Sequence, residues 1–195
     1  MMSDALRQSM KRFVQLTEAE YDYILSHFRR QAVRKKEHIF RAGEICKLAV
    51  YCEEGCFRKY YLNDEGEEIV VDFAIEDYWI GDLNSLYNRV PTPFSFQALE
   101  DSILQVAPIS DWEKISMEIP EFGKMRYAKE KRHYNKNVEL LTLEKFASAA
   151  EKYEKLLERF PGITNRVAGK FIASYLSIKP ESLSRLKKLT AGKKT

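Results

Sequence analysis

The chain has 195 residues, of which 45% are hydrophobic and 31% charged, and its net charge at pH 7 is +3. This length and composition are typical of a globular protein with one large or two small domains and a sizeable core. No apolar run reaches the roughly 20 residues of a membrane span, and the first residues contain no apolar signal segment. We therefore expect a cytoplasmic protein without a membrane partner.

The three cysteines, Cys46, Cys52 and Cys56, are odd in number and close together in the sequence, unlike a secreted disulfide framework. Their spacing matches no metal- or cluster-binding pattern and leaves a fourth ligand missing. We interpret Cys52 and Cys56 as small buried hydrophobic residues on strands rather than as a redox sensor or iron–sulfur ligands. The role of Cys46 stays open.

The first half of the chain reads as one helix followed by short strands. Apolar residues at helical spacing after Thr17, a suitable N-cap, predict a helix over residues 18–29. From residue 31 to about 106, short apolar segments alternate with Gly-containing turns, which is typical of an antiparallel barrel or roll. The predicted strands are 38–40, 48–52, 57–62 and 68–75.

Helical periodicity returns over residues 110–117, and Pro120 opens a longer helix from 121 to about 143. A helix of this length cannot bury its whole apolar stripe against a small barrel, so pairing with a second copy of the chain is the favoured interpretation. One more core helix is the alternative. The predicted dimer-contact residues are Phe122, Met125, Tyr134, Val138 and Leu141.

A further helix, 148–160, ends at Pro161-Gly162, and a pair of short helices is predicted over residues 169–189. The pair has the small Ala173 where two helices approach closely, and Pro180 suits the first position of its second helix. Ser177 stands where such a turn usually has glycine. The inward apolar residues are Ile172, Leu176, Ile178, Leu183 and Leu186.

The uncovered face of the second helix carries side chains that can bond to base edges and phosphates. Residues 179–195 contain six basic residues and one acidic residue, a net charge of +5 in a chain whose total is +3. Positive charge is thus concentrated at this end, as binding to double-stranded DNA requires. A basic helix pair without DNA binding is the alternative. The candidate DNA-binding residues are Lys179, Glu181, Ser182, Ser184, Arg185 and Lys188.

Several short motifs, in their order and spacing, resemble the Crp/Fnr family of bacterial transcription regulators. They are Arg41-Ala42-Gly43-Glu44, Asp77-Tyr78-Trp79-Ile80-Gly81-Asp82, Phe96-Gln97-Ala98-Leu99-Glu100-Asp101 and Ile172-Ala173-Ser174-Tyr175-Leu176, with Glu54-Gly55, Arg58-Lys59-Tyr60-Tyr61, Asn63-Asp64-Glu65-Gly66 and Ala150-Glu151-Lys152-Tyr153 between them.

The resemblance implies an α+β fold of the cyclic-nucleotide-binding-domain type. Residues 1–118 would form the N-terminal helix and a jelly-roll-like antiparallel β-roll, 119–145 a long dimerisation helix, and 146–195 a helix-turn-helix domain. The sequence ends within six residues of Leu189, so we expect no β-wing after the recognition helix.

Nucleotide-binding members of the family contact the ribose with a Gly-Glu pair and the cyclic phosphate with an Arg-Ser or Arg-Thr pair. The matching residues here are Gly81-Asp82, followed by Leu83, and Phe94-Ser95. Without the arginine the pocket lacks its bidentate charged partner for a phosphate, so we do not expect cyclic-nucleotide binding through this clamp. No cofactor is predicted, a small-molecule effector is a candidate, and Arg89 is a candidate replacement cation.

The family often reads bases through an Arg-Glu-x-x-x-Arg run, of which Glu181 and Arg185 are present and the leading arginine is replaced by Pro180. The resemblance implies a homodimeric transcription regulator, with DNA and a second copy as partners and RNA polymerase as a further candidate. The alternative is a sensor or interaction module that has lost DNA binding. Neither catalysis nor a metal site is expected, because His27, His38 and His133 lie far apart and no catalytic residue pattern is present.

Overall fold

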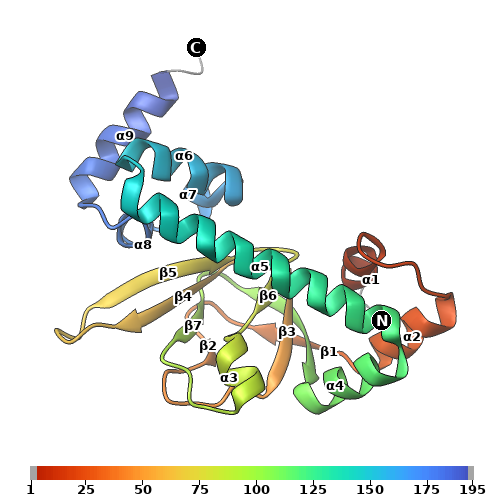
Figure 1. Cartoon of the computed structure of the whole chain (residues 1–195). Helices are drawn as coiled ribbons and strands as arrows, with labels where there is room; N and C mark the ends of the chain where they lie inside the picture. Colours follow the sequence, from red (N-terminus) through yellow and green to blue (C-terminus); the bar gives the residue numbers. More distant parts are fainter. Residues whose placement is uncertain (1–3, 193–195) are drawn as a thin grey trace.

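The structure, a computed structural model, describes residues 4–192, without the side chains of residues 136, 143, 144 and 190–192. Two four-stranded sheets form a β-roll, a long helix runs along the roll, and a group of short helices follows at the far end of that helix (Figure 1). The predicted α+β class and antiparallel roll are therefore confirmed.

Every strand pair in the two sheets is antiparallel, so each sheet can pack one face inward. All four predicted strands are present within one or two residues of their predicted ends. The first sheet has the order β1 (Arg29–Val33), β8 (Ser102–Pro108), β3 (Leu48–Glu54), β6 (Trp79–Ile80); the second has the order β2 (His38–Phe40), β7 (Ser95–Ala98), β4 (Phe57–Leu62), β5 (Glu68–Ala74).

The roll is filled by inward side chains of both sheets, among them Phe57, Phe96 and Leu104. The three cysteines are free thiols and buried. Burial is the main cause that raises their pKa values, that of Cys56 to about 12, so little reactive thiolate forms at neutral pH. The interpretation of Cys52 and Cys56 as buried hydrophobic residues is confirmed.

Three helices cover the outer face of the first sheet: α1 (Asp4–Lys11), α2 (Glu18–Ser26) and α4 (Ile109–Glu118). Helix α2 begins as predicted, because Thr17 and Glu20 form a reciprocal capping box. Helix α1 was not predicted. Its buried apolar residues are Leu6 and Met10, and two such residues one turn apart are too few to indicate a helix.

Helix α5 spans Pro120–Phe146. The prediction that all five stripe residues contact a second chain is wrong for two of them. Phe122 and Met125 are 0% and 1% exposed and pack in the same core cluster as Trp112, so they are unavailable to a second chain. The helix turns by about 100° per residue, so Met125 and Tyr134, nine residues apart, lie on opposite faces. The outer face keeps Tyr134, Val138 and Leu141, which are 67%, 45% and 65% exposed.

The C-terminal group consists of α6 (Ala149–Arg159), α7 (Ile163–Arg166), α8 (Gly169–Tyr175) and α9 (Pro180–Gly192). Ser148 and Glu151 cap α6 reciprocally, which fixes its start at the predicted place. This group shares one hydrophobic cluster with the roll: Tyr60, Val70 and Phe73 of the second sheet pack with residues of α6 to α9. The two parts are therefore joined by a common core.

Candidate ligand pocket and nucleic-acid interface

Helices α8 and α9 pack as the sequence pattern predicts. Ile172, Ala173 and Leu183 are buried between them, and a methyl group at Gly169 would touch Leu183 Cδ2 at 3.7 Å. Ser177, between the helices, has φ 55°, so this turn needs the left-handed conformation that usually selects glycine. The geometry is that of two short helices joined by a tight turn.

The outward face of α9 carries the candidate DNA-binding residues. Ser182 is half-buried, whereas Lys179, Glu181, Ser184, Arg185 and Lys188 are exposed. Among the described residues no ion pair joins Glu181 to Arg185, so both side chains are available to another molecule. Lys193 and Lys194, which contribute to the predicted positive charge, lie outside the described residues.

Asp82, matched to the ribose contact of the family, has a structural role instead. It is the N-cap of helix α3 (Leu83–Asn88), where its carboxylate accepts a hydrogen bond from the Asn84 amide at 3.1 Å. The Thr92 hydroxyl donates a second bond to it at 2.9 Å. Because capping satisfies a backbone donor that would otherwise lack a partner, this carboxylate is committed to holding α3 in place.

The other residues expected around the phosphate position are also occupied or displaced. Ser95 Oγ accepts a hydrogen bond from the Ala42 amide at 3.1 Å. Arg89 is the C-cap residue of α3, with φ 54°, and its side chain is exposed. It does not line the cavity between the β4–β5 hairpin and α5. Arg89 therefore does not replace the missing arginine in this structure.

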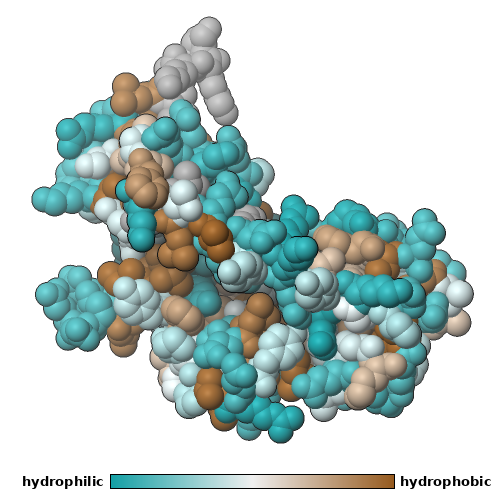
Figure 2. Space-filling model, viewed as in Figure 1, coloured by the Kyte–Doolittle hydropathy of each residue, from teal (hydrophilic) through white to brown (hydrophobic). Residues whose placement is uncertain are grey.

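A cavity of about 680 Å³ lies between the β4–β5 hairpin, the second half of α5, helix α6 and the end of α8. The surface is hollowed between α5 and this hairpin, and hydrophobic side chains gather around the hollow (Figure 2). Of the predicted pocket residues, Gly81 and Phe94 line it; Asp82, Leu83 and Ser95 do not, and Leu83 faces a second, smaller hollow. The predicted pocket set is corrected accordingly.

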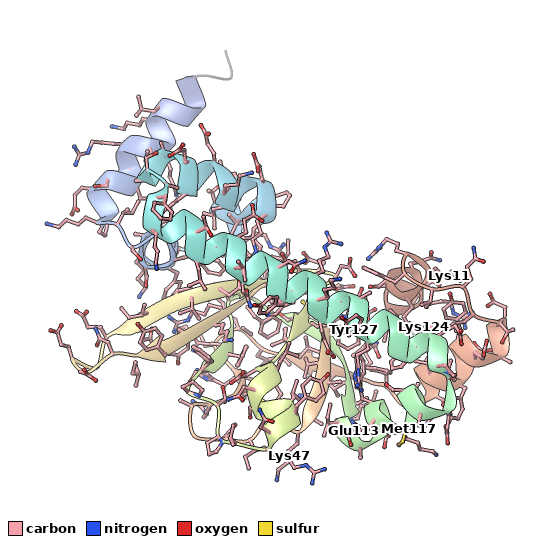
Figure 3. The ribbon with its side chains drawn as sticks, viewed as in Figure 1. Lys11, Lys47, Glu113, Met117, Lys124 and Tyr127 are labelled. Atoms are coloured by element: carbon pink, nitrogen blue, oxygen red, sulfur yellow. The ribbon has the colours of Figure 1, made fainter. Side chains whose placement is uncertain are left out.

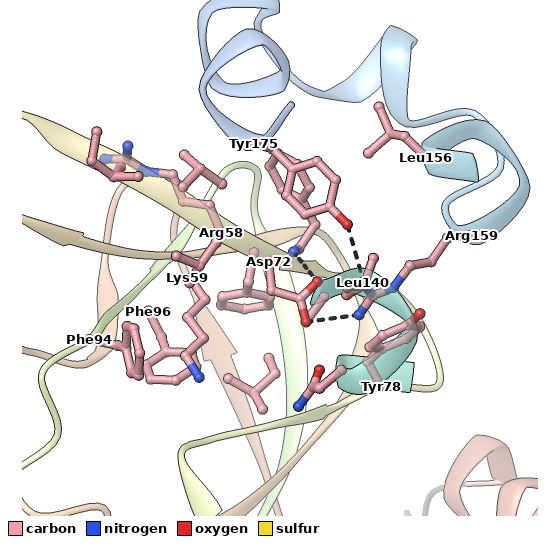
Figure 4. A pocket seen from close by; sticks show the side chains of 18 of the residues that line it. Arg58, Lys59, Asp72, Tyr78, Phe94, Phe96, Leu140, Leu156, Arg159 and Tyr175 are labelled. Carbon is pink, nitrogen blue, oxygen red and sulfur yellow. Dashed lines mark hydrogen bonds and ion pairs between the residues drawn. The ribbon is translucent and has the colours of Figure 1, made fainter. Parts of the chain in front are cut away.

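Lys59 is a cavity residue that the sequence did not reveal. Its Nζ lies 3.9 Å from the centre of the Phe94 ring and points into the cavity (Figure 4). Burial lowers its pKa, while Asp82 and Asp72 act in the opposite direction. Lys59 lies two residues from the inward Phe57 and opposite Phe96 of β7, so strand alternation places it on the inner face of the roll. The sequence does not reveal that α5 and α6 border a cavity at this point.

One wall of the cavity carries an ion pair between the roll and α6. Arg159 donates to Asp72 at 2.9 Å, and these side chains are only 7% and 19% exposed (Figure 4). A second Arg159 nitrogen lies 3.3 Å from the Tyr175 hydroxyl of α8. Arg159 of α6 thus bonds to both β5 and α8 in this wall of the cavity.

Two further sets of polar contacts join the roll to the C-terminal helices. Arg166 of α7 pairs with Glu76, at 2.7 Å, and with Glu100, and these carboxylates raise its pKa. The Val70 amide of β5 donates to Ser174 Oγ of α8 at 3.0 Å. Helices α7 and α8 are therefore bonded to the roll, and α8 is bonded to the same hairpin that lines the cavity.

Among the described residues, no group of three or more His, Cys, Asp or Glu side chains could hold a metal ion. Within the same part of the chain, no helix combines the length and apolar character of a membrane span.

Residues 30–118 match the family model of the cyclic nucleotide-binding domain. No curated protein compared with the chain matches it significantly. Among solved structures, FixK2 from Bradyrhizobium japonicum is similar with a TM-score of 0.72 and 17% identity over 85% of each chain.

Two more regulators have similar structures. The c-di-GMP-responsive global regulator CLP of Xanthomonas campestris matches with a TM-score of 0.69 and 13% identity, over 90% of this chain and 93% of that one. The catabolite activator protein of Thermus thermophilus matches with a TM-score of 0.56 and 21% identity, over 95% and 87%. The chain therefore shares the fold of these Crp/Fnr regulators, and its residues 30–118 match the cyclic nucleotide-binding domain.

Proposed function

We propose that the protein is a homodimeric, DNA-binding transcription regulator whose helix-turn-helix responds to an effector in the roll cavity. The observation that carries the proposal is the exposed polar face of α9. Glu181 and Arg185 lie one turn apart on it without pairing to each other, on a helix held in place by the buried Leu183. Arg can donate two bonds to guanine and Glu can accept from cytosine, which is direct readout of a major groove.

The outer face of α5 supports the dimer. Tyr127, Tyr134, Val138 and Leu141 recur at spacings of seven, four and three residues, and all four are exposed. Leu141 also borders the cavity, so the proposed dimer face reaches the edge of the ligand site. This is the spacing of a seam between two paired helices. A two-fold dimer would present two α9 helices to successive half-sites, the usual arrangement for a single helix-turn-helix per chain.

The shared core supports control by a ligand. The cavity takes part of its lining from the roll and part from α6 and α8, so an occupant would contact both. A ligand shifts a conformational equilibrium only if it binds the two states differently. The proposal therefore requires that this junction adopts two arrangements with different affinities for the occupant.

Binding-site selection from random duplexes, followed by affinity measurements for the selected site and for random DNA, tests the proposal. Arg185→Ala should weaken binding to the selected site by about 1 to 3 kcal/mol and relax the preference at one position per half-site. Lys188→Ala, the matched variant one turn further along α9, should weaken all sequences alike.

Equal losses on all sequences from both variants would show that Arg185 contacts only phosphate. No selected sequence and no affinity for duplex DNA would instead favour a sensor or interaction module without DNA binding.

A further inference from the structure

We propose that the cavity takes an amphipathic anion, an apolar body with one carboxylate-, sulfonate- or phosphate-like group, and that Lys59 Nζ anchors its charge. This inference rests on the proposed function in one respect: it names the class of ligand that the same cavity would bind.

Lys59 has the position that an anchor requires. It extends from β4 into the cavity beside Phe94, the residue that stands where the family has its phosphate-binding arginine. Lys59, on the neighbouring strand β4, therefore supplies a positive charge beside the position where the family has its arginine. Among the described residues, no hydrogen bond or ion pair to Lys59 Nζ is present, so its three donors are available to a ligand.

The remaining charges of the lining favour an anion over a cation. Five lining residues are Lys or Arg and one, Asp72, is acidic. Asp72 is already bound by Arg159, and the Arg58 guanidinium is engaged by Glu68 at 2.6 Å. Arg159 also has a buried Nε without a hydrogen-bond partner among the described residues. A cationic ligand would find no uncommitted carboxylate here, whereas an anion finds Lys59.

The shape and polarity of the rest of the lining favour an apolar body. Phe94 and Phe96 lie beside Lys59, and Tyr78, Leu140 and Leu156 face the same space (Figure 4). The volume is in the range of small-molecule sites, which are mostly apolar with a few placed polar groups. A lysine is a point charge that accepts many anion geometries, unlike the bidentate arginine of a cyclic-phosphate clamp.

Two dyes of nearly equal shape test the proposal on the full chain. The probe is 1-anilinonaphthalene-8-sulfonate, and its uncharged counterpart is N-phenyl-1-naphthylamine, which lacks the sulfonate. We expect Lys59→Met to weaken binding of the sulfonate tenfold or more and to leave the neutral dye within twofold. Lys59→Arg should keep most of the sulfonate affinity, because it keeps the charge.

Lys47→Met is the matched control, because Lys47 is exposed at the edge of the roll away from α5 (Figure 3); it should change neither affinity. Equal sulfonate binding by the wild type and Lys59→Met would overturn the proposal. Equal losses of both dyes would also overturn it, since they would assign Lys59 to packing alone. These measurements need no DNA, so a failure of DNA binding and a failure of the anion site are separate results.

Discussion

Lys129 shows how one buried charge affects stability. It extends from α5 over the outer face of the first sheet, where Ser9 Oγ lies 3.1 Å from its Nζ and the rings of Phe13 and Trp79 lie within 6 Å. Burial lowers its pKa from 10.5 to about 8, against the opposing effect of Asp77. The folded state therefore releases this proton at a lower pH than the unfolded state does.

The free energy of unfolding should thus carry a penalty below pH 8 that disappears as the pH rises toward 10.5. We expect the wild type to gain about 1 to 3 kcal/mol relative to Lys129→Met over this window, measured by urea unfolding at each pH. Because the tyrosines titrate in both proteins, their contribution cancels when the free energies of unfolding of the wild type and Lys129→Met are subtracted at each pH. Lys124→Met, a change at an exposed lysine of the same helix (Figure 3), should show no such pH-dependent difference. A constant difference between wild type and Lys129→Met would contradict the burial of this charge.

At the same scale, the sequence could predict the residues of α9 but not the cavity. The inward and outward positions of a helix follow from its periodicity, so the sequence alone predicts that Leu183 and Arg185 lie on opposite sides of α9. The cavity beside Lys59 depends on the approach of α5 and α6 to β4, and these helices are distant from that strand in the sequence. Asp82 was assigned to ligand binding because its motif position does not reveal that α3 begins directly after it.

At the scale of elements, the pair between Arg159 and Asp72 joins α6 to β5 across the cavity wall. A pair this buried is strongly destabilised when one member is removed, because the other charge is left without a partner. Arg159→Met should lower the free energy of unfolding by about 2 to 4 kcal/mol, and Asp72→Asn by a similar amount. The double variant should lose less than the sum, with a coupling energy of about 1 to 3 kcal/mol.

Urea unfolding at equal protein concentration measures this cycle. Lys155→Met is the control, because Lys155 lies on the same helix and pairs with Glu158 at the surface. A coupling energy near zero would mean that α6 does not depend on this pair for its position on the roll.

Element boundaries were predictable where capping residues mark them, as at Thr17 and Ser148. The two faces of α5 could not be separated from the sequence, because a spacing near 3.5 residues over twenty positions predicts a single stripe. The true division follows from the 3.6-residue turn, which places Phe122 and Met125 inward and Tyr134 outward.

At the scale of the whole molecule, the order of roll, long helix and C-terminal group of short helices could be predicted from motif order. The docking of the last unit on the β4–β5 hairpin could not, since its contacts join residues about a hundred positions apart, such as Val70 and Ser174. In the proposed regulator, this docking is the route by which an occupant of the cavity would affect the position of α9.

The most direct test of the proposed regulator is the affinity of the full chain for duplex DNA over a range of salt concentrations. A dimer should show log K falling linearly with log salt, with a slope of about −0.9 for each phosphate neutralised. Val138→Glu places a charge on the exposed α5 face at a residue that does not itself line the cavity; it should give monomers in sedimentation and about half the wild-type slope. No salt-sensitive affinity of the wild-type chain for any duplex would contradict DNA binding, and an unchanged dimer in Val138→Glu would contradict the assigned dimer face.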